Sequence, residues 1–243
     1  MRTWMAAALL TAASIGAGAP AATAMQADSA AGEAEVLAIG QMVSDAFDLD
    51  YRTQKDAIRD AFIRIEARAK ASGGRFASDP ETAMQLRSLQ GVGAFYAAQH
   101  NDPDYGDVAG QQQEIAWLDE TVRMLGPVLE ARNGEGEHYE FRGAAGQLFD
   151  QGLRFGDPRL PEWSAMRVQA NRYRVKAIPD DWFEKVLLAE ALYDHGWLTK
   201  NQALTDEANR IAATVPEDEM RGSLRRKRDA VAAGEAPYHQ PGD

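Results

Sequence analysis

The stretch IAWLDETVRMLGPVL, residues 115–129, carries the clearest structural pattern in the chain. An α-helix turns once in 3.6 residues, so apolar side chains at alternating steps of three and four share one face. The stretch predicts an amphipathic helix with one apolar seam, and Pro127 is expected to kink or split it. The residues of the seam are Ile115, Leu118, Val122, Leu125 and Leu129.

Helical periodicity of this kind extends over most of the chain, and we find no clear stretch of the strict alternation that is typical of a strand. Short turn-forming groups separate the periodic segments, and short connections favour antiparallel neighbours. We therefore predict an all-α fold of about nine helices, arranged as stacked antiparallel helical hairpins or as an irregular bundle. The expected breaks include Gly73-Gly74, His100–Asp107, Asn133-Gly134, Gly156-Asp157-Pro158 and Pro179-Asp180.

The first 24 residues have the layout of a secretory signal peptide. Arg2 supplies positive charge, residues 6–19 are small and apolar, and Ala22-Thr23-Ala24 matches the small-x-small rule of signal peptidase. A membrane anchor is the alternative, but the apolar run is shorter than the ~20 residues that a spanning helix needs. We predict cleavage after Ala24 and a periplasmic or secreted protein.

The remaining 219 residues are expected to comprise a flexible leader (25–35), a single helical domain (36–233) and a disordered tail (234–243). Arg2 is the one charged residue removed, so 25 Lys and Arg face 37 Asp and Glu, a net charge of −12. This balance argues against nucleic-acid binding, which depends on neutralising phosphates. The absence of cysteine excludes disulfides and cysteine nucleophiles. We expect no transmembrane segment after the signal peptide.

Residues 183–216 form a candidate helical hairpin. Gly196-Trp197-Leu198 is the expected turn, and Thr199–Gln202 fits a capping box at the start of the second helix. The hairpin resembles one tetratricopeptide unit of about 34 residues. That resemblance implies peptide or protein binding on a concave face, without catalysis. Its matching positions are Leu188, Ala189, Leu192, Tyr193 and Ala208, and its departures are Asn201, Thr205 and Pro216.

No catalytic or cofactor motif is found in the sequence, and we predict neither a bound cofactor nor a metal. The four histidines lack the spacing of a zinc motif. The acidic loop His100–Asp107 fails as an EF-hand, because from Asp102 the glycine is fifth and Gln113 stands where a glutamate is needed. A pair of carboxylates on separate helices stays open, because the chain has 37 acidic residues.

A basic run near the C-terminus is the most distinctive surface feature that the sequence predicts. Helical spacing places its first, second and last arginines on one face. Such a face suits an acidic partner, anionic lipid headgroups or carboxylates of the same fold, and its alternative is a solvated helix face. The candidate partner-binding residues are Arg221, Arg225, Arg226, Lys227 and Arg228.

Three hypotheses for the function of the protein follow, and the first is preferred because no catalytic motif is found. The first is a non-enzymatic module that binds a peptide or another envelope protein in an open groove of mixed polarity. The second is an envelope hydrolase, which requires two converging carboxylates with perturbed ionisation. The third is a lipid- or small-molecule-binding protein, which requires an enclosed apolar cavity. Trp163, Trp182 and Trp197 in the second half are candidates to line such a cavity.

Overall fold

The computed structural model describes residues 20–104, 106–132, 134–216 and 222–238, and only the backbone of residues 20–28. Within these ranges every regular element is a helix, which confirms the all-α prediction. The helices are α1 Pro20–Phe47, α2 Lys55–Arg75, α3 Pro80–Gln99, α4 Val108–Ala131, α5 His138–Phe155, α6 Leu160–Ala177, α7 Trp182–Thr199, α8 Gln202–Ala212 and α9 Gly222–Ala232.

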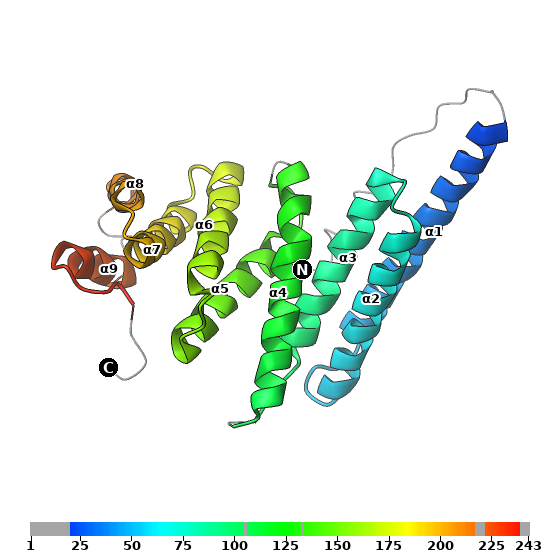
Figure 1. Ribbon diagram of the computed structural model, residues 1–243, viewed down its shortest axis with the longest axis horizontal. Helices are drawn as coiled ribbons and strands as arrows, with labels where there is room; N and C mark the ends of the chain where they lie inside the picture. The colour runs from blue at the N-terminus through cyan, green and yellow to red at the C-terminus, as the bar shows by residue number, and fades with distance from the viewer. Residues whose placement is uncertain (1–19, 105, 133, 217–221, 239–243) are drawn as a thin grey trace.

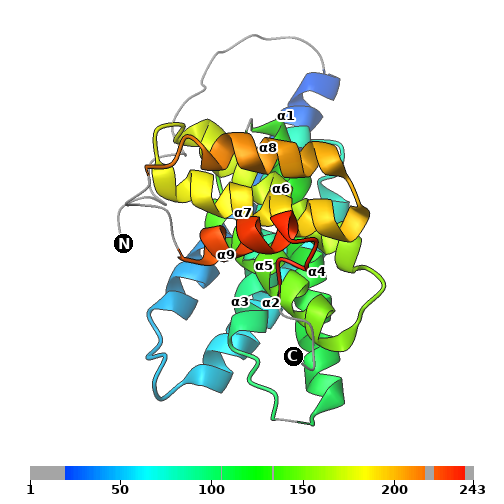
Figure 2. The ribbon, with the colours of Figure 1, turned by 90° about the vertical axis from the view of Figure 1, so that its left-hand side faces the viewer.

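The helices follow one another along the long axis of the molecule in the order of the chain, from α1 at one end to α8 and α9 at the other (Figure 1). Each helix from α1 to α7 packs on the next, and further contacts join α1 with α3, α3 with α5 and α7 with α9. The ion pair between Arg142 and Glu184 likewise links the odd-numbered helices α5 and α7. Figure 2 shows that α7, α8 and α9 run across the direction of α2, α3 and α4. The odd-numbered helices thus form one side of a twisting stack.

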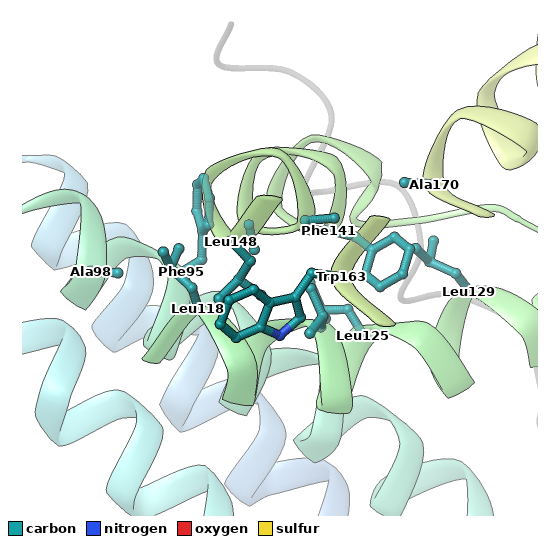
Figure 3. Packing of buried hydrophobic residues seen from close by; sticks show 12 residues of the cluster. Phe95, Ala98, Leu118, Leu125, Leu129, Phe141, Leu148, Trp163 and Ala170 are labelled. Carbon is teal, nitrogen blue, oxygen red and sulfur yellow. The ribbon is translucent and has the colours of Figure 1, made fainter. Parts of the chain in front are cut away.

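Three clusters of buried apolar side chains follow one another along the stack. The first joins α1, α2 and α3, the second joins α3 to α6 around Trp163, and the third joins α6 to α9 (Figure 3 shows the second). Tyr96 and Trp117 pack against both the first and the second cluster. The predicted seam lies in the second cluster, where Leu118, Leu125 and Leu129 are fully buried, so that prediction is confirmed. Each such leucine stabilises the fold by roughly 1.5–3 kcal/mol.

Proline and glycine set fewer boundaries than the sequence predicts. Helix α4 is continuous through Pro127, whose exposed position lets water reach the carbonyl that loses its amide partner. Helix α2 likewise continues through Gly73-Gly74 to Arg75. The helix stop expected at Gly156 is confirmed, with a left-handed φ of 63°. Asp79 caps the start of α3, where its side chain accepts a hydrogen bond from the backbone of Thr82.

The turn predicted at Gly196 is wrong, because α7 continues through it to Thr199. A Cβ at position 196 would lie 3.0 Å from Thr205 Oγ1 and 3.3 Å from Leu204 Cβ. This glycine therefore permits close packing of α7 on α8 instead of reversing the chain. The cap of α8 is Asn201, which accepts a hydrogen bond from the backbone of Ala203, and the predicted Thr199 capping box is wrong.

The leader predicted over residues 25–35 is helical, because α1 begins at Pro20. Ala31 packs on the first cluster, and Glu35 accepts hydrogen bonds from Arg68 Nε and Nη2, both at 2.7 Å, and from Ser72 Oγ at 2.8 Å. The hydrogen bonds from Arg68 are the main cause that lowers the pKa of Glu35 to about 2. Small residues and one paired acid thus attach this segment to α2, so residues 29–35 are part of the packed fold.

Glycines of the stack give a matched test of its packing. At Gly93 a Cβ would lie 2.7 Å from the backbone nitrogen of Glu66, whereas at Gly40 it would meet nothing within 4 Å. We expect Gly93→Ala to lower the free energy of unfolding by about 1–3 kcal/mol through overpacking of α3 on α2. Gly40→Ala should raise it by about 0.5–1 kcal/mol, because alanine loses less backbone entropy in a helix. Urea unfolding followed by circular dichroism measures both, and equal effects would contradict the packing argument.

Candidate functional site

Two adjoining cavities open on the side of the stack formed by the odd-numbered helices. The first, about 370 Å³, is bordered by α3, α5, α6 and α7, and we name it the aromatic cavity. The second, about 730 Å³, is bordered by α5, α6, α7, α9 and the segment after α9, and we name it the C-terminal cavity. Asp150 and Arg167 line both cavities, so the two form one continuous groove.

Aromatic side chains from three helices line the aromatic cavity. Phe95 of α3 and Tyr139 of α5 meet edge to face with ring centroids 5.9 Å apart, and Phe183 of α7 also lines the cavity. Glycines of α5 make room between them. A Cβ at Gly143 would lie 2.9 Å from the ring of Phe95, whereas a Cβ at Gly146 would meet nothing within 4 Å. The α5 side of the cavity therefore includes bare backbone, which leaves space for an incoming side chain.

Asn171 of α6 supplies a buried polar group to the aromatic cavity. Its side chain is 3% exposed, and its Nδ2 donates a hydrogen bond of 2.8 Å to the carbonyl of Arg167. This bond fixes the orientation of the amide. Its Oδ1 is buried and finds no hydrogen-bond partner among the described residues. A buried acceptor without a donor costs about 1–3 kcal/mol, so a donor that reached Oδ1 would be favoured.

A buried ion-pair cluster underlies the C-terminal cavity. Asp194 of α7 is 0% exposed, and it accepts hydrogen bonds of 2.6 Å from Arg167 Nη1 and 2.6 Å from Lys227 Nζ. Each oxygen of Asp194 takes one cation, so α6, α7 and α9 meet at this carboxylate. Such a desolvated group is tolerated only because both of its oxygens are paired.

A second buried carboxylate, Glu184, lies on α7 nearly three turns before Asp194. Glu184 accepts from Arg142 Nη1 at 2.7 Å and from Arg174 Nε at 3.1 Å. Its side chain is buried, and Arg142 itself lines the aromatic cavity. The two arginines of that cavity, Arg142 and Arg167, are thus each held in place by a carboxylate of α7.

Asp150 lies where the two cavities meet. Burial raises the pKa of Asp150, and the nearby charge of Asp194 adds to this rise, whereas Arg167 and Lys227 oppose it. Asp194 and Glu235 also line the C-terminal cavity, and the two oxygens of Asp194 already accept from cations. A mechanism that paired Asp150 with Asp194 would require Asp194 to give up one of these bonds.

The segment after α9 forms part of the wall of the C-terminal cavity, and residues 235–238 of the predicted tail make defined contacts there. Pro237 is buried, and its carbonyl accepts a hydrogen bond of 2.9 Å from Lys227 Nζ. Tyr238 meets Phe149 edge to face with ring centroids 6.1 Å apart. Apolar contact and one charged donor therefore hold a non-helical piece of chain against the groove. The rest of the predicted tail, 239–243, lies outside the described residues.

The basic residues predicted as a partner-binding face have different surroundings in the structure. Arg221 lies outside the described residues. Lys227 points inward to the ion-pair cluster and is 15% exposed in its side chain. Arg225 and Arg226 are exposed, and Arg226 lines the C-terminal cavity, whereas Arg228 is half-buried. Of the described four, Lys227 stabilises the fold instead of contributing an exposed charge.

The acidic loop and His195 make contacts within the fold. Asp102 pairs with Lys55 at 2.5 Å, and Asp107 caps α4 by accepting from the backbone of Gly110. His195 Nδ1 lies 2.7 Å from Ser164 Oγ, whose hydroxyl donates to the carbonyl of Pro161. Ser164 itself is 1% exposed. No group of three or more His, Asp or Glu side chains among the described residues is arranged to hold a metal ion.

The acidic cluster near the start of α5 pairs with other helices. Glu137 accepts from Ser88 Oγ, and Glu140 accepts from the hydroxyl of Tyr96 at 3.2 Å. Burial is the main cause that raises the pKa of Tyr96 and the pKa of Glu140 above their ordinary values. Of the three tryptophans considered for a ligand cavity, Trp163 is fully buried and donates to Asp119, and none of the three lines the groove.

Comparison with known proteins identifies no relative: no family model, no curated protein and no solved structure matches this chain. Among the described residues, the helices all fall short of the length and apolar character that crossing a membrane requires. The function of the groove therefore has to be inferred from the residues that line it.

The ion-pair cluster yields a stability prediction. Asp194→Ala leaves Arg167 and Lys227 facing each other without their carboxylate, and should lower the free energy of unfolding by about 3 kcal/mol. This is the lower end of the range for a broken buried pair, because the two cations remain 19% and 15% exposed. Lys55→Ala removes an exposed pair of similar length and should cost at most about 1 kcal/mol. Similar losses in urea unfolding for both variants would contradict the assigned role of Asp194.

Proposed function

We propose that this protein is a non-enzymatic binding module that holds a segment of another protein in the groove on the odd-numbered helices. The observation that carries the proposal is the aromatic cavity, which combines aromatic walls, bare α5 backbone and the unpartnered acceptor of Asn171. Peptide segments offer the apolar surface and the N–H donors that such a cavity lacks.

The chain itself shows that a non-helical segment can pack on these helices. Residues 235–238 form part of the wall of the adjoining cavity, with an aromatic ring and a backbone carbonyl as their contacts. The resemblance of residues 183–216 to a tetratricopeptide hairpin implies a peptide or protein ligand.

The two alternatives have weaker support. A hydrolase would use Asp150, whose pKa is raised, but its neighbour Asp194 is occupied by Arg167 and Lys227. A lipid carrier would need an enclosed apolar cavity, whereas both parts of the groove are open and lined by arginines.

A peptide-display selection against the purified protein tests the proposal. Gly146→Leu would fill the aromatic cavity from α5, where open space surrounds the missing Cβ. Leucine is also the better helix former by roughly 1 kcal/mol, so the variant should fold at least as well. We expect selected peptides to bind the unsubstituted protein and to bind Gly146→Leu at least about tenfold more weakly, a loss of about 1.4 kcal/mol.

Gly40→Leu is the matched control, because Gly40 is a helical glycine with the same open surroundings on α1, outside the groove. Its affinity for the selected peptides should equal that of the unsubstituted protein. Selection of no peptides, or of peptides that bind Gly146→Leu undiminished, would contradict binding in this groove.

We also propose that the protein is exported and acts in the periplasm or outside the cell. The support is the charge, apolar run and small-x-small site of residues 1–24. Intact-mass measurement of the protein purified from its native cells should give a chain that begins at Met25. A chain that retains residues 1–24 and stays in the cytoplasm would contradict export.

A further inference from the structure

The aromatic cavity has the surroundings that a buried aromatic ring prefers. Phe95, Tyr139 and Phe183 present rings from three helices, and Leu187 adds an aliphatic contact. Aromatic rings pack on one another edge to face or offset, and each such pair adds about 0.5–1.5 kcal/mol beyond the area buried. The edge-to-face contact of Phe95 and Tyr139 already has this geometry. An incoming ring would extend the same arrangement.

The polar requirement of the cavity is equally specific. The Nδ2 of Asn171 is engaged by the carbonyl of Arg167, so the Oδ1 is the atom that needs a partner, and it needs a donor. An aliphatic or phenyl side chain would leave this acceptor unsatisfied. An indole N–H or a phenol O–H would satisfy it, and these two aromatic groups are the ones that usually find a hydrogen-bond partner when buried.

A ring of this class forms part of the wall of the neighbouring cavity. Tyr238 packs edge to face on Phe149 of α5, one turn beyond Gly146, and burial raises the pKa of its phenol. Helix α5 therefore packs against an aromatic side chain that a non-helical segment presents, and the aromatic cavity is the next section along α5.

Resting on the proposed function, we propose that the aromatic cavity binds a tryptophan or tyrosine side chain of the partner segment. The ring lies among Phe95, Tyr139 and Phe183, and its N–H or O–H donates to Oδ1 of Asn171. Indole has a donor and no acceptor, so tryptophan matches the cavity best. Phenylalanine fits the walls but lacks the donor.

Titration of the ¹⁵N-labelled protein with simple amino-acid amides, followed by backbone amide NMR shifts, tests this assignment. The probes are N-acetyl-tryptophanamide, its N1-methylated indole analogue, N-acetyl-tyrosinamide and N-acetyl-phenylalaninamide. We expect the tryptophan and tyrosine amides to shift the amide signals of Gly143 and Gly146. The phenylalanine and methylated probes should bind there about tenfold more weakly, the effect of one unsatisfied buried acceptor.

Asn171→Leu separates the hydrogen bond from a general structural role. It should bring the affinity of the tryptophan amide down to that of the phenylalanine amide, and leave the phenylalanine affinity unchanged. The comparison of tryptophan with its methylated analogue needs no variant, so it decides the matter even if Asn171→Leu folds poorly. Equal affinities for all four probes, shifts away from the cavity, no binding of the tryptophan amide, or an unchanged preference in Asn171→Leu would each overturn the assignment.

The failure of this inference is distinguishable from the failure of the proposed function. Display-selected peptides that lack tryptophan and tyrosine, yet lose affinity for Gly146→Leu, would leave the groove as a peptide site and refute the aromatic-donor specificity. Peptides that ignore Gly146→Leu would refute both.

Discussion

The pairing of Asp194 with Arg167 and Lys227 is the interaction on which the C-terminal half of the molecule depends. A carboxylate with 0% exposure is stable only when cations compensate it, and here they come from α6 and α9. The same Lys227 holds the carbonyl of Pro237, so the segment after α9 is attached through the same cluster. One desolvated charge thereby sets the positions of three helices and of one wall of the groove.

This electrostatic arrangement also determines what the groove can do. Glu184 and Asp194 engage Arg142 and Arg167, so the guanidinium groups of the aromatic cavity are fixed in place. The charges of these arginines are compensated, whereas Oδ1 of Asn171 has no hydrogen-bond donor among the described residues. The groove combines this requirement with aromatic walls, and the two together favour recognition of a side chain over chemistry on a substrate.

Local patterns predicted most of the secondary structure. The seam of residues 115–129 lies in the core as expected, and the stop at Gly156 holds because the left-handed glycine ends its own helix. The predicted leader is rich in alanine and glutamate, which favour a helix, and α1 packs on α2. Gly196 has low helix propensity, and it is helical because α7 packs closely on α8. Tertiary packing outweighs such propensities, which amount to about 1 kcal/mol per residue.

The sequence by itself determined the all-helical class, the seams and many of the helix ends, because helical periodicity and capping act over a few residues. The groove was decided by the tertiary structure alone. The residues of the aromatic cavity come from four helices and share no motif, as Phe95, Tyr139, Asn171 and Phe183 show. In the sequence Lys227 belongs to a basic run, and its inward position follows from the packing of α9 against α7. These side chains converge because the helices pack at particular angles and separations. The glycines of the interfaces and the buried carboxylates of α7 set these angles and separations through contacts between residues far apart in the chain.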